Sequence, residues 1–181
     1  MTTKITSMDI EIEVASYFDM RRHLIVPNVS WMIGHECDVL ILSPAGVATE
    51  VEIKISLADL KIDKKKHHAH KSPLIHKLYF AIPDYMEKDI EHIPEHAGIL
   101  IVTPQKKRSW RNPSVRCIRE PKMNKDKKGK ILPKWSPEKR LELLRLSTMR
   151  IWSLKEKLNK QLKEKIKCKS ESSVKAVAEH I

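Results

Sequence analysis

Within residues 36–55, a Ser-Pro-Ala-Gly segment at 43–46 separates two stretches. The first is mainly apolar, and in the second apolar and polar residues alternate. The proline suits the first corner of a turn, and the glycine accepts the left-handed conformation that a short hairpin loop requires. The pattern therefore predicts a β-hairpin with Ala45 at its apex. In that register Asp38 lies directly opposite Glu52, and the even-numbered residues of both strands share one face of the sheet.

Apolar periodicity and helix-capping residues predict the other elements. Ile10, Val14 and Phe18 recur at helical spacing, and Ser-Pro-Glu at 136–138 is a typical helix start. Short apolar runs that end at prolines indicate strands. In chain order we expect a helix at 8–22, a strand at 24–26 that ends at Pro27, the hairpin, a helix that begins at Ser56, a strand at 77–82, a helix at 84–92, strands at 98–102 and 115–119, and a helix from 136 to about 167.

This order of elements predicts an α/β fold with a mixed central sheet flanked by helices and a long C-terminal helix. The chain has 181 residues, which is enough for one such core with an appendage. We expect a core at 1–135 that includes a basic loop at 103–135, a C-terminal helix at 136–168 packed on the core, and a flexible tail at 169–181.

Asp38 and Glu52 are the first candidates for a functional site, because like charges that face each other destabilise a strand pair unless a cation lies nearby. We expect Mg²⁺ or Mn²⁺, which such carboxylates bind together with waters and phosphate oxygens. The Ile53 carbonyl completes the candidate ligand set, and the Lys54 ammonium reaches a water or a phosphate oxygen. These groups are what phosphodiester hydrolysis needs. The alternative is that Glu36 and Lys54 form an ordinary cross-strand ion pair, while Asp38 and Glu52 lie at solvated strand ends.

An acid that precedes a Glu-x-Lys triplet by thirteen intervening residues, across a hairpin and after an amphipathic helix, resembles the PD-(D/E)XK nuclease superfamily. Asp38 and the Glu-Ile-Lys triplet at 52–54 match its core motif, while Cys37 occupies a position where many members have proline. The resemblance implies a restriction-endonuclease-like fold and a magnesium-dependent deoxyribonuclease, with Asp38, Glu52 and Lys54 as catalytic residues.

Members of this superfamily often add a glutamate from the first helix. Glu11 is our choice, because Val14 and Phe18 follow it at a spacing similar to that in archaeal Holliday-junction resolvases, and Glu13 is the close alternative. Many relatives with this fold act as dimers, so the resemblance also makes a homodimer an expectation.

A narrower resemblance covers residues 8–155. The segments at 52–56, 78–83 and 97–102 look like the MmcB family of DNA-repair proteins, and residues 140–152 are similar to the C-terminal helix of that family. This resemblance implies the same fold and a role in DNA metabolism.

The net charge of +12 is concentrated in one segment. Residues 103–135 carry twelve Lys or Arg residues against two acids, and Trp110 and Trp135 within them are candidates for stacking on bases. Localised positive charge of this kind indicates a polyanionic partner, and we expect DNA. The candidate DNA contacts are Lys106, Lys107, Arg108, Arg111, Lys122, Lys125, Lys127, Lys128 and Lys130.

Several classes of protein are not expected. No apolar run approaches the ~20 residues that span a bilayer, and the N-terminus lacks the apolar core of a signal peptide, which favours a cytoplasmic protein without a membrane partner. The three cysteines are far apart and match neither a disulfide framework nor a zinc motif. The four histidines between 67 and 76 lack the usual spacing of zinc ligands, so a basic surface patch is favoured.

Two hypotheses of different class follow. The first is a metal-dependent DNA endonuclease or DNA-repair nuclease that uses Glu11, Asp38, Glu52 and Lys54. The alternative is a non-catalytic DNA-binding protein that retains the nuclease fold. A structural partner protein that uses the helix at 137–167 is a third, weaker idea.

Overall fold

The structure is a computed structural model that describes residues 5–30, 32–63, 72–103 and 114–178, with side chains described as far as residue 166. The chain divides into two compact units, Met1–Arg140 and Leu141–Ile181. The first unit contains every strand and nearly all of the residues singled out above. The second consists mainly of the long C-terminal helix.

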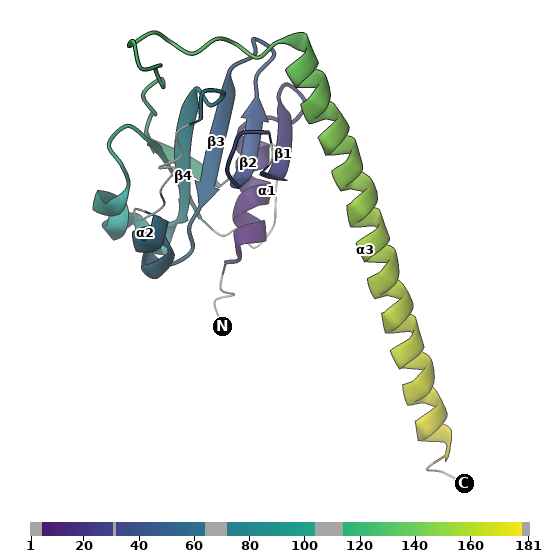
Figure 1. Cartoon of the computed structure of the whole chain (residues 1–181). Helices are drawn as coiled ribbons and strands as arrows, with labels where there is room; N and C mark the ends of the chain where they lie inside the picture. The colour runs from purple at the N-terminus through teal and green to yellow at the C-terminus, as the bar shows by residue number, and fades with distance from the viewer. Residues whose placement is uncertain (1–4, 31, 64–71, 104–113, 179–181) are drawn as a thin grey trace. The chain divides into compact units, whose positions relative to one another are not determined.

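A six-stranded mixed sheet forms the centre of the first unit, and its strands lie side by side in chain order (Figure 1). The first three strands form an antiparallel meander, the third to fifth are parallel, and the sixth is antiparallel to the fifth. The strands are β1 Leu24–Val29, β2 Cys37–Leu42, β3 Ala48–Ile53, β4 Lys77–Pro83, β5 Gly98–Val102 and β6 Val115–Arg119. The mixed sheet predicted from the sequence is confirmed.

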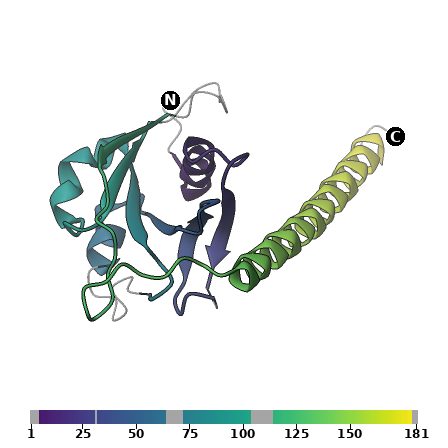
Figure 2. The ribbon, with the colours of Figure 1, turned by 90° about the horizontal axis from the view of Figure 1, so that it is seen from above.

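Helices cover both faces of this sheet (Figure 2). The helix α1, Ser7–Tyr17, packs Ile10 and Val14 against the odd-numbered side chains of β2 and β3. On the opposite face, the helix α2, Leu57–Asp63, and the 3₁₀ helix η1, Asp84–His92, contribute Leu60 and Met86 to a second apolar layer. Since β5 lies between the two layers, all five of its residues are buried, as the continuous apolar run predicts.

The predicted hairpin between β2 and β3 is confirmed in both its turn and its register. The Ser43 N–H donates to the Val47 carbonyl at 3.0 Å, and the Gly46 N–H donates to the Ser43 carbonyl at 2.9 Å. Gly46 has a φ of +82°, the left-handed conformation expected of it. Leu40 lies opposite Glu50, as the sequence predicts.

The first helix and the first strand differ in length from the prediction. The helix ends at Tyr17 rather than near residue 22, because Asp19 takes a positive φ of 52° just beyond the C-cap. The strand β1 does not end at Pro27 but continues to Val29. It lies at the edge of the sheet, where a proline without an N–H is tolerated.

The C-terminal helix α3 spans Pro137–Ala178 and is longer than the sequence predicts. It begins where the Ser-Pro-Glu start was expected, and the Ser136 hydroxyl accepts a hydrogen bond from the Lys139 N–H at 3.4 Å. The packing of this helix on the core stays a prediction. Across the described ranges, no helix is both long enough and apolar enough to cross a membrane.

Candidate functional site

The acidic residues of the predicted motif gather at one edge of the sheet, where β2 begins and β3, β4 and β5 end. We call this edge the carboxylate end. The opposite edge, which contains the turn at 43–46 and the start of β4, is the hairpin end. In Figure 1, α2 follows β3 at the carboxylate end, and the segment after β6 passes the hairpin end.

Asp38 contacts the neighbouring strand through its side chain. The paired register of β2 and β3 ends at Val39 and Val51. One residue further, the Asp38 carboxylate accepts a hydrogen bond of 2.7 Å from the Ile53 backbone N–H. The side chain therefore continues the strand pairing where the backbone ladder ends, and it fixes the carboxylate beside the last residues of β3.

Glu52 and Lys54 form a buried ion pair. The Lys54 ammonium donates to the Glu52 carboxylate at 2.9 Å, and the two side chains are 5% and 2% exposed. Charged groups are costly to bury and are retained where they are paired. The alternative in which Glu52 lies at a solvated strand end is wrong.

A second buried pair lies next to the first on β3. Glu50 is fully buried, and one of its carboxylate oxygens lies 2.8 Å from Nε2 of His35. Sequence reasoning missed His35 as a member of this cluster. The available signal was that Glu50 shares the buried face of Glu52 and therefore needs a polar partner.

The structure distinguishes the surroundings of the two glutamates on α1. Burial raises the pKa of Glu11, and repulsion from Asp38 raises it further, so the two carboxylates lie within electrostatic reach of one another. The Glu13 carboxylate instead accepts a hydrogen bond of 3.0 Å from the Ser114 N–H, just before β6. Glu11 is thus the helix carboxylate that adds to the negative potential around Asp38.

The surroundings of Cys37 show the same concentration of negative charge. Its thiol is fully buried, and its pKa is raised well above the ordinary value by burial and then by the charges of Glu50, Glu52 and Asp38. A thiol in these surroundings stays neutral. It is a small side chain that adds no further charge to the cluster.

Carboxylates outnumber the basic groups at the carboxylate end. Glu11, Asp38, Glu50 and Glu52 gather there, whereas Lys54 and His35 are the basic groups bonded to them. Among the described residues, no three His, Cys, Asp or Glu side chains form a group that could hold a metal ion alone. The Asp38 and Glu52 carboxylates and the Ile53 carbonyl fit Mg²⁺, which takes one or two carboxylates and completes its shell with waters and phosphate oxygens.

The described part of the basic segment does not lie beside these carboxylates. Lys122, Lys125, Lys127, Lys128 and Lys130 are exposed in the loop that follows β6, which runs along the hairpin end of the sheet (Figure 1). The other four candidate DNA contacts, Lys106, Lys107, Arg108 and Arg111, lie outside the described residues.

The loop after β6 is ordered by its own hydrogen bonds. Lys125 and Ile131 form an isolated antiparallel bridge, and the Asp126 carboxylate accepts 2.8 Å hydrogen bonds from the backbone N–H groups of Lys128 and Lys130. The Asn124 N–H donates to the His76 carbonyl at 2.8 Å, which fastens the loop to the start of β4. The lysines are therefore presented from a fixed backbone.

Two predicted roles in this region are wrong. Trp135 is 3% exposed, and its indole N–H donates to the Leu74 carbonyl at 2.7 Å, so it anchors the loop and cannot stack on bases. His76 is buried rather than part of a surface patch, and its Nδ1 accepts a hydrogen bond of 3.2 Å from the Ala48 N–H. Trp110 and the histidines at 67, 68 and 70 lie outside the described residues.

Comparison with models of known protein families shows which family this chain belongs to. Residues 2–129 match the family described as DNA repair protein MmcB-like. The chain belongs to the MmcB-like family. The matched region of this MmcB-like chain contains the carboxylate end and all six strands, and it stops within the basic loop before α3 begins.

One solved structure supports the fold of this MmcB-like chain. A protein of unknown function from Silicibacter pomeroyi is 18% identical and superimposes with a TM-score of 0.58, covering 87% of this chain and 94% of its own. At this level of identity the likeness concerns the fold alone. No curated protein matches the sequence.

Proposed function

We propose that this MmcB-like protein is a metal-dependent deoxyribonuclease of the PD-(D/E)XK superfamily, with a restriction-endonuclease-like fold, that acts in DNA repair. The observation that carries the proposal is the buried Lys54–Glu52 pair at 2.9 Å beside Asp38, with Glu11 within electrostatic reach of Asp38. Buried ion pairs contribute little to the free energy of folding. A lysine that is buried among carboxylates at a sheet edge is therefore better explained by a role in hydrolysis than by a role in stability.

Each residue of the carboxylate end has a role in this proposal. Asp38, Glu52 and the Ile53 carbonyl hold Mg²⁺ or Mn²⁺, which when bound supplies Lewis acidity toward a phosphate oxygen and the attacking water. Glu52 fixes the Lys54 ammonium, and Lys54 orients the water and offsets the charge that develops on the phosphate. Glu11 orients the water from the α1 side or contributes to a second ion.

The reaction that these groups support is hydrolysis of a phosphodiester. A water oxygen forms a bond to phosphorus, the bond to the leaving sugar oxygen breaks, and the leaving oxygen takes up a proton. The water loses its own proton to a carboxylate or to solvent. No redox partner is required.

The test is cleavage of branched, single-stranded and duplex DNA with Mg²⁺ or Mn²⁺, comparing the wild type with Asp38→Ala and Lys54→Ala. We expect cleavage that requires the metal and falls about 100-fold or more in both variants, since each loses a group that acts on the transition state. A matched control is Asp59→Ala, which removes a carboxylate near the start of α2. Metal-dependent cleavage that survives Asp38→Ala and Lys54→Ala would mean that the reaction occurs elsewhere.

A non-catalytic DNA-binding protein is the second candidate, and one observation favours it. The exposed lysines from 122 to 130 lie at the hairpin end, so they contact DNA without bringing the same phosphates to the carboxylate end. This candidate expects salt-sensitive DNA binding that is unchanged in Asp38→Ala, strongly reduced by charge reversal at 122–130, and accompanied by no cleavage in any metal.

A further inference from the structure

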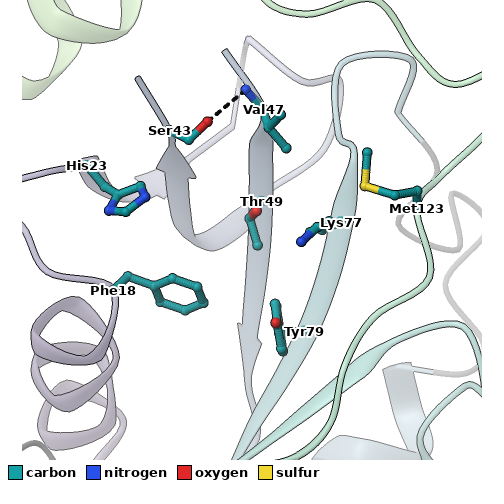
Figure 3. A pocket seen from close by; sticks show the side chains of 8 residues that line it. All are labelled: Phe18, His23, Ser43, Val47, Thr49, Lys77, Tyr79 and Met123. Carbon is teal, nitrogen blue, oxygen red and sulfur yellow. Dashed lines mark hydrogen bonds between the residues drawn. The ribbon is translucent and has the colours of Figure 1, made fainter. Parts of the chain in front are cut away.

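A cavity of about 420 Å³ opens at the hairpin end, on the sheet face that α1 covers (Figure 3). Phe18 and His23 line it from the segment after α1, Thr49 from β3, Lys77 and Tyr79 from β4, and Met123 from the basic loop. A volume of this order falls within the roughly 300–1,000 Å³ range of small-ligand sites. It is separate from the carboxylate end and has no role in the proposed hydrolysis.

The cavity combines a cation with hydrogen-bonding groups. Nδ1 of His23 is buried and has no hydrogen-bond partner among the described residues. Figure 3 shows the Thr49 hydroxyl and the Lys77 ammonium between His23 and Met123. A buried ring nitrogen without a partner is costly unless a ligand or a water satisfies it, so these groups indicate a polar and anionic ligand.

Apolar groups form the rest of the lining. The ring centroids of Phe18 and Tyr79 lie 5.7 Å apart at 72°, an edge-to-face contact rather than a parallel stack. In Figure 3 the Phe18 ring and the Met123 thioether lie on opposite sides of Thr49 and Lys77. Aromatic rings and polarisable sulfur both make favourable contacts with a flat heteroaromatic ring.

An ionised acid, Glu120, is hydrogen-bonded to Tyr79, one of the residues that line the cavity. The Tyr79 hydroxyl donates to the Glu120 carboxylate at 2.7 Å, and this bond lowers the pKa of Glu120, so the acid stays ionised. The Lys77 charge also lowers the pKa of Glu120, so the two charges lie within electrostatic reach of each other; Glu120 repels an anion from the Tyr79 side, and the Lys77 ammonium is the group that attracts one. The negative part of a ligand is therefore expected near Lys77.

The basic loop connects this cavity to a path for nucleic acid. Met123 lies between Lys122 and Lys125, which are both exposed, and Lys127, Lys128 and Lys130 follow on the ordered hairpin. Because Met123 lines the cavity and its neighbours in the loop are lysines, we expect a backbone bound along this loop to bring its bases near the cavity. A base pair is too large and too rigidly stacked to enter, but a single unpaired base with its phosphate is of suitable size.

We propose that this cavity binds one unpaired deoxynucleotide, with its base between Phe18 and Met123 and its phosphate near Lys77. The site makes the hairpin end selective for single-stranded DNA over duplex. This inference rests on the proposed binding of DNA, and it does not require cleavage.

The first test is fluorescence anisotropy of a labelled oligodeoxyadenylate and of a blunt duplex of the same length, with the full chain in EDTA. Thr49→Val removes a hydroxyl at nearly constant volume, and Lys77→Met removes a charge while keeping the chain length. We expect each to weaken single-strand binding about fivefold to tenfold and duplex binding less than twofold. Lys88→Met, which removes an exposed lysine on η1, is the matched control and should change neither.

The second test separates a bound nucleotide from a bound anion. Protein labelled at its methionine methyl groups is titrated with deoxyadenosine monophosphate, with the oligodeoxyadenylate and with inorganic phosphate, and Met123→Leu assigns the signal. We expect the Met123 methyl resonance to shift with both adenine ligands and not with phosphate. A shift with phosphate alone, or no shift with either adenine ligand, would overturn the proposal.

The outcomes also separate this inference from the proposed function. If the wild type binds single strands and duplex equally and the cavity variants match the control, the nucleotide site is refuted while DNA binding stands. If the wild type binds neither DNA in EDTA, both the nucleotide site and DNA binding by the loop are refuted. Loss of metal-dependent cleavage in Asp38→Ala would support catalysis at the carboxylate end, and it does not test the nucleotide site.

Discussion

The Asp38 carboxylate accepts a 2.7 Å hydrogen bond from the Ile53 backbone N–H, so a side chain on β2 contacts β3 two residues beyond Val51, the last paired residue of that strand. This bond has two consequences. It holds the acid in place without a metal ion, and it places the Asp38 carboxylate beside the residue that follows Glu52. Carboxylates that are positioned in advance need little rearrangement to bind a cation.

The Asp38–Ile53 bond allows charge and hydrogen bonding to be separated by substitution. Asp38→Asn keeps an oxygen that accepts from the Ile53 N–H but removes the charge, whereas Asp38→Ala removes both. We expect Asp38→Ala to lower the free energy of unfolding by about 1–3 kcal/mol, and Asp38→Asn to have a smaller effect. Urea unfolding measures the difference, and equal destabilisation by both variants would contradict it. Both are expected to lose Mn²⁺ binding in isothermal titration.

Glu11 is expected to destabilise the protein in the absence of metal. Burial and the Asp38 charge raise its pKa, so its ionised form is disfavoured in the folded state at pH 7. Stability from this group is present at low pH and is lost as the pH rises through the raised pKa. Glu11→Gln should therefore raise the Tm at pH 7 in EDTA.

Glu13→Gln is the matched control for that substitution, because an amide oxygen still accepts from the Ser114 N–H. We expect it to leave the Tm unchanged or slightly lower. Mg²⁺ should stabilise the wild type more than Glu11→Gln. A lower Tm for Glu11→Gln than for Glu13→Gln would show that the Glu11 charge is not under repulsion.

Lys54 is expected to be essential for the stability of the carboxylate end. Lys54→Met keeps most of the side-chain volume but leaves Glu52 without its ammonium partner. Removing one member of a buried ion pair costs about 3–5 kcal/mol. Thermal unfolding should show this loss, and Mn²⁺ should recover part of it by replacing the missing positive charge. No recovery with Mn²⁺ would argue against an ion at this position.

Gly46 is expected to control the register on which the site depends. Its φ is +82°, and an added Cβ would collide with the Arg140 guanidinium, which donates to the Pro44 carbonyl. Gly46→Ala should cost about 1–2 kcal/mol from the left-handed backbone. Ala45→Gly is the control at the neighbouring position. A Gly46→Ala chain as stable as the wild type would mean that the turn adjusts freely.

His76 is expected to make the protein less stable in mild acid. Burial lowers its pKa below the ordinary value, so between the two values the unfolded chain binds more protons than the folded protein. Stability is therefore present above about pH 6.5 and is lost as the pH falls. His76→Gln should flatten the fall in Tm between pH 7 and pH 5.5. An unchanged slope in His76→Gln would assign the pH dependence to other groups.

The hairpin and the buried strands could be predicted because local patterns determine them. The turn residues at 43–46 require one backbone conformation, and the period-two pattern then sets which side chains face each other. That is why Leu40 lies opposite Glu50 as expected. The lengths of α1 and β1 depend on a positive φ at Asp19 and on the edge position of β1, and neither is visible in apolar periodicity.

The partners within the site could not be predicted, because they depend on contacts between distant segments. His35 reaches Glu50 across the sheet end, Glu13 reaches Ser114, and Trp135 is buried against Leu74. The sequence also treats 103–135 as one basic stretch, and it does not show that the described lysines after β6 lie at the hairpin end. Only the sheet topology gives that position.

The most direct test of the central claim is a crystal structure of the protein soaked in Mn²⁺, with anomalous scattering used to locate the ion. The account predicts an anomalous peak within bonding distance of carboxylate oxygens of both Asp38 and Glu52, and no such peak in crystals of Asp38→Asn. A well-diffracting Mn²⁺ soak without a peak there, or a peak that Asp38→Asn leaves unchanged, would contradict a metal-dependent site at the carboxylate end.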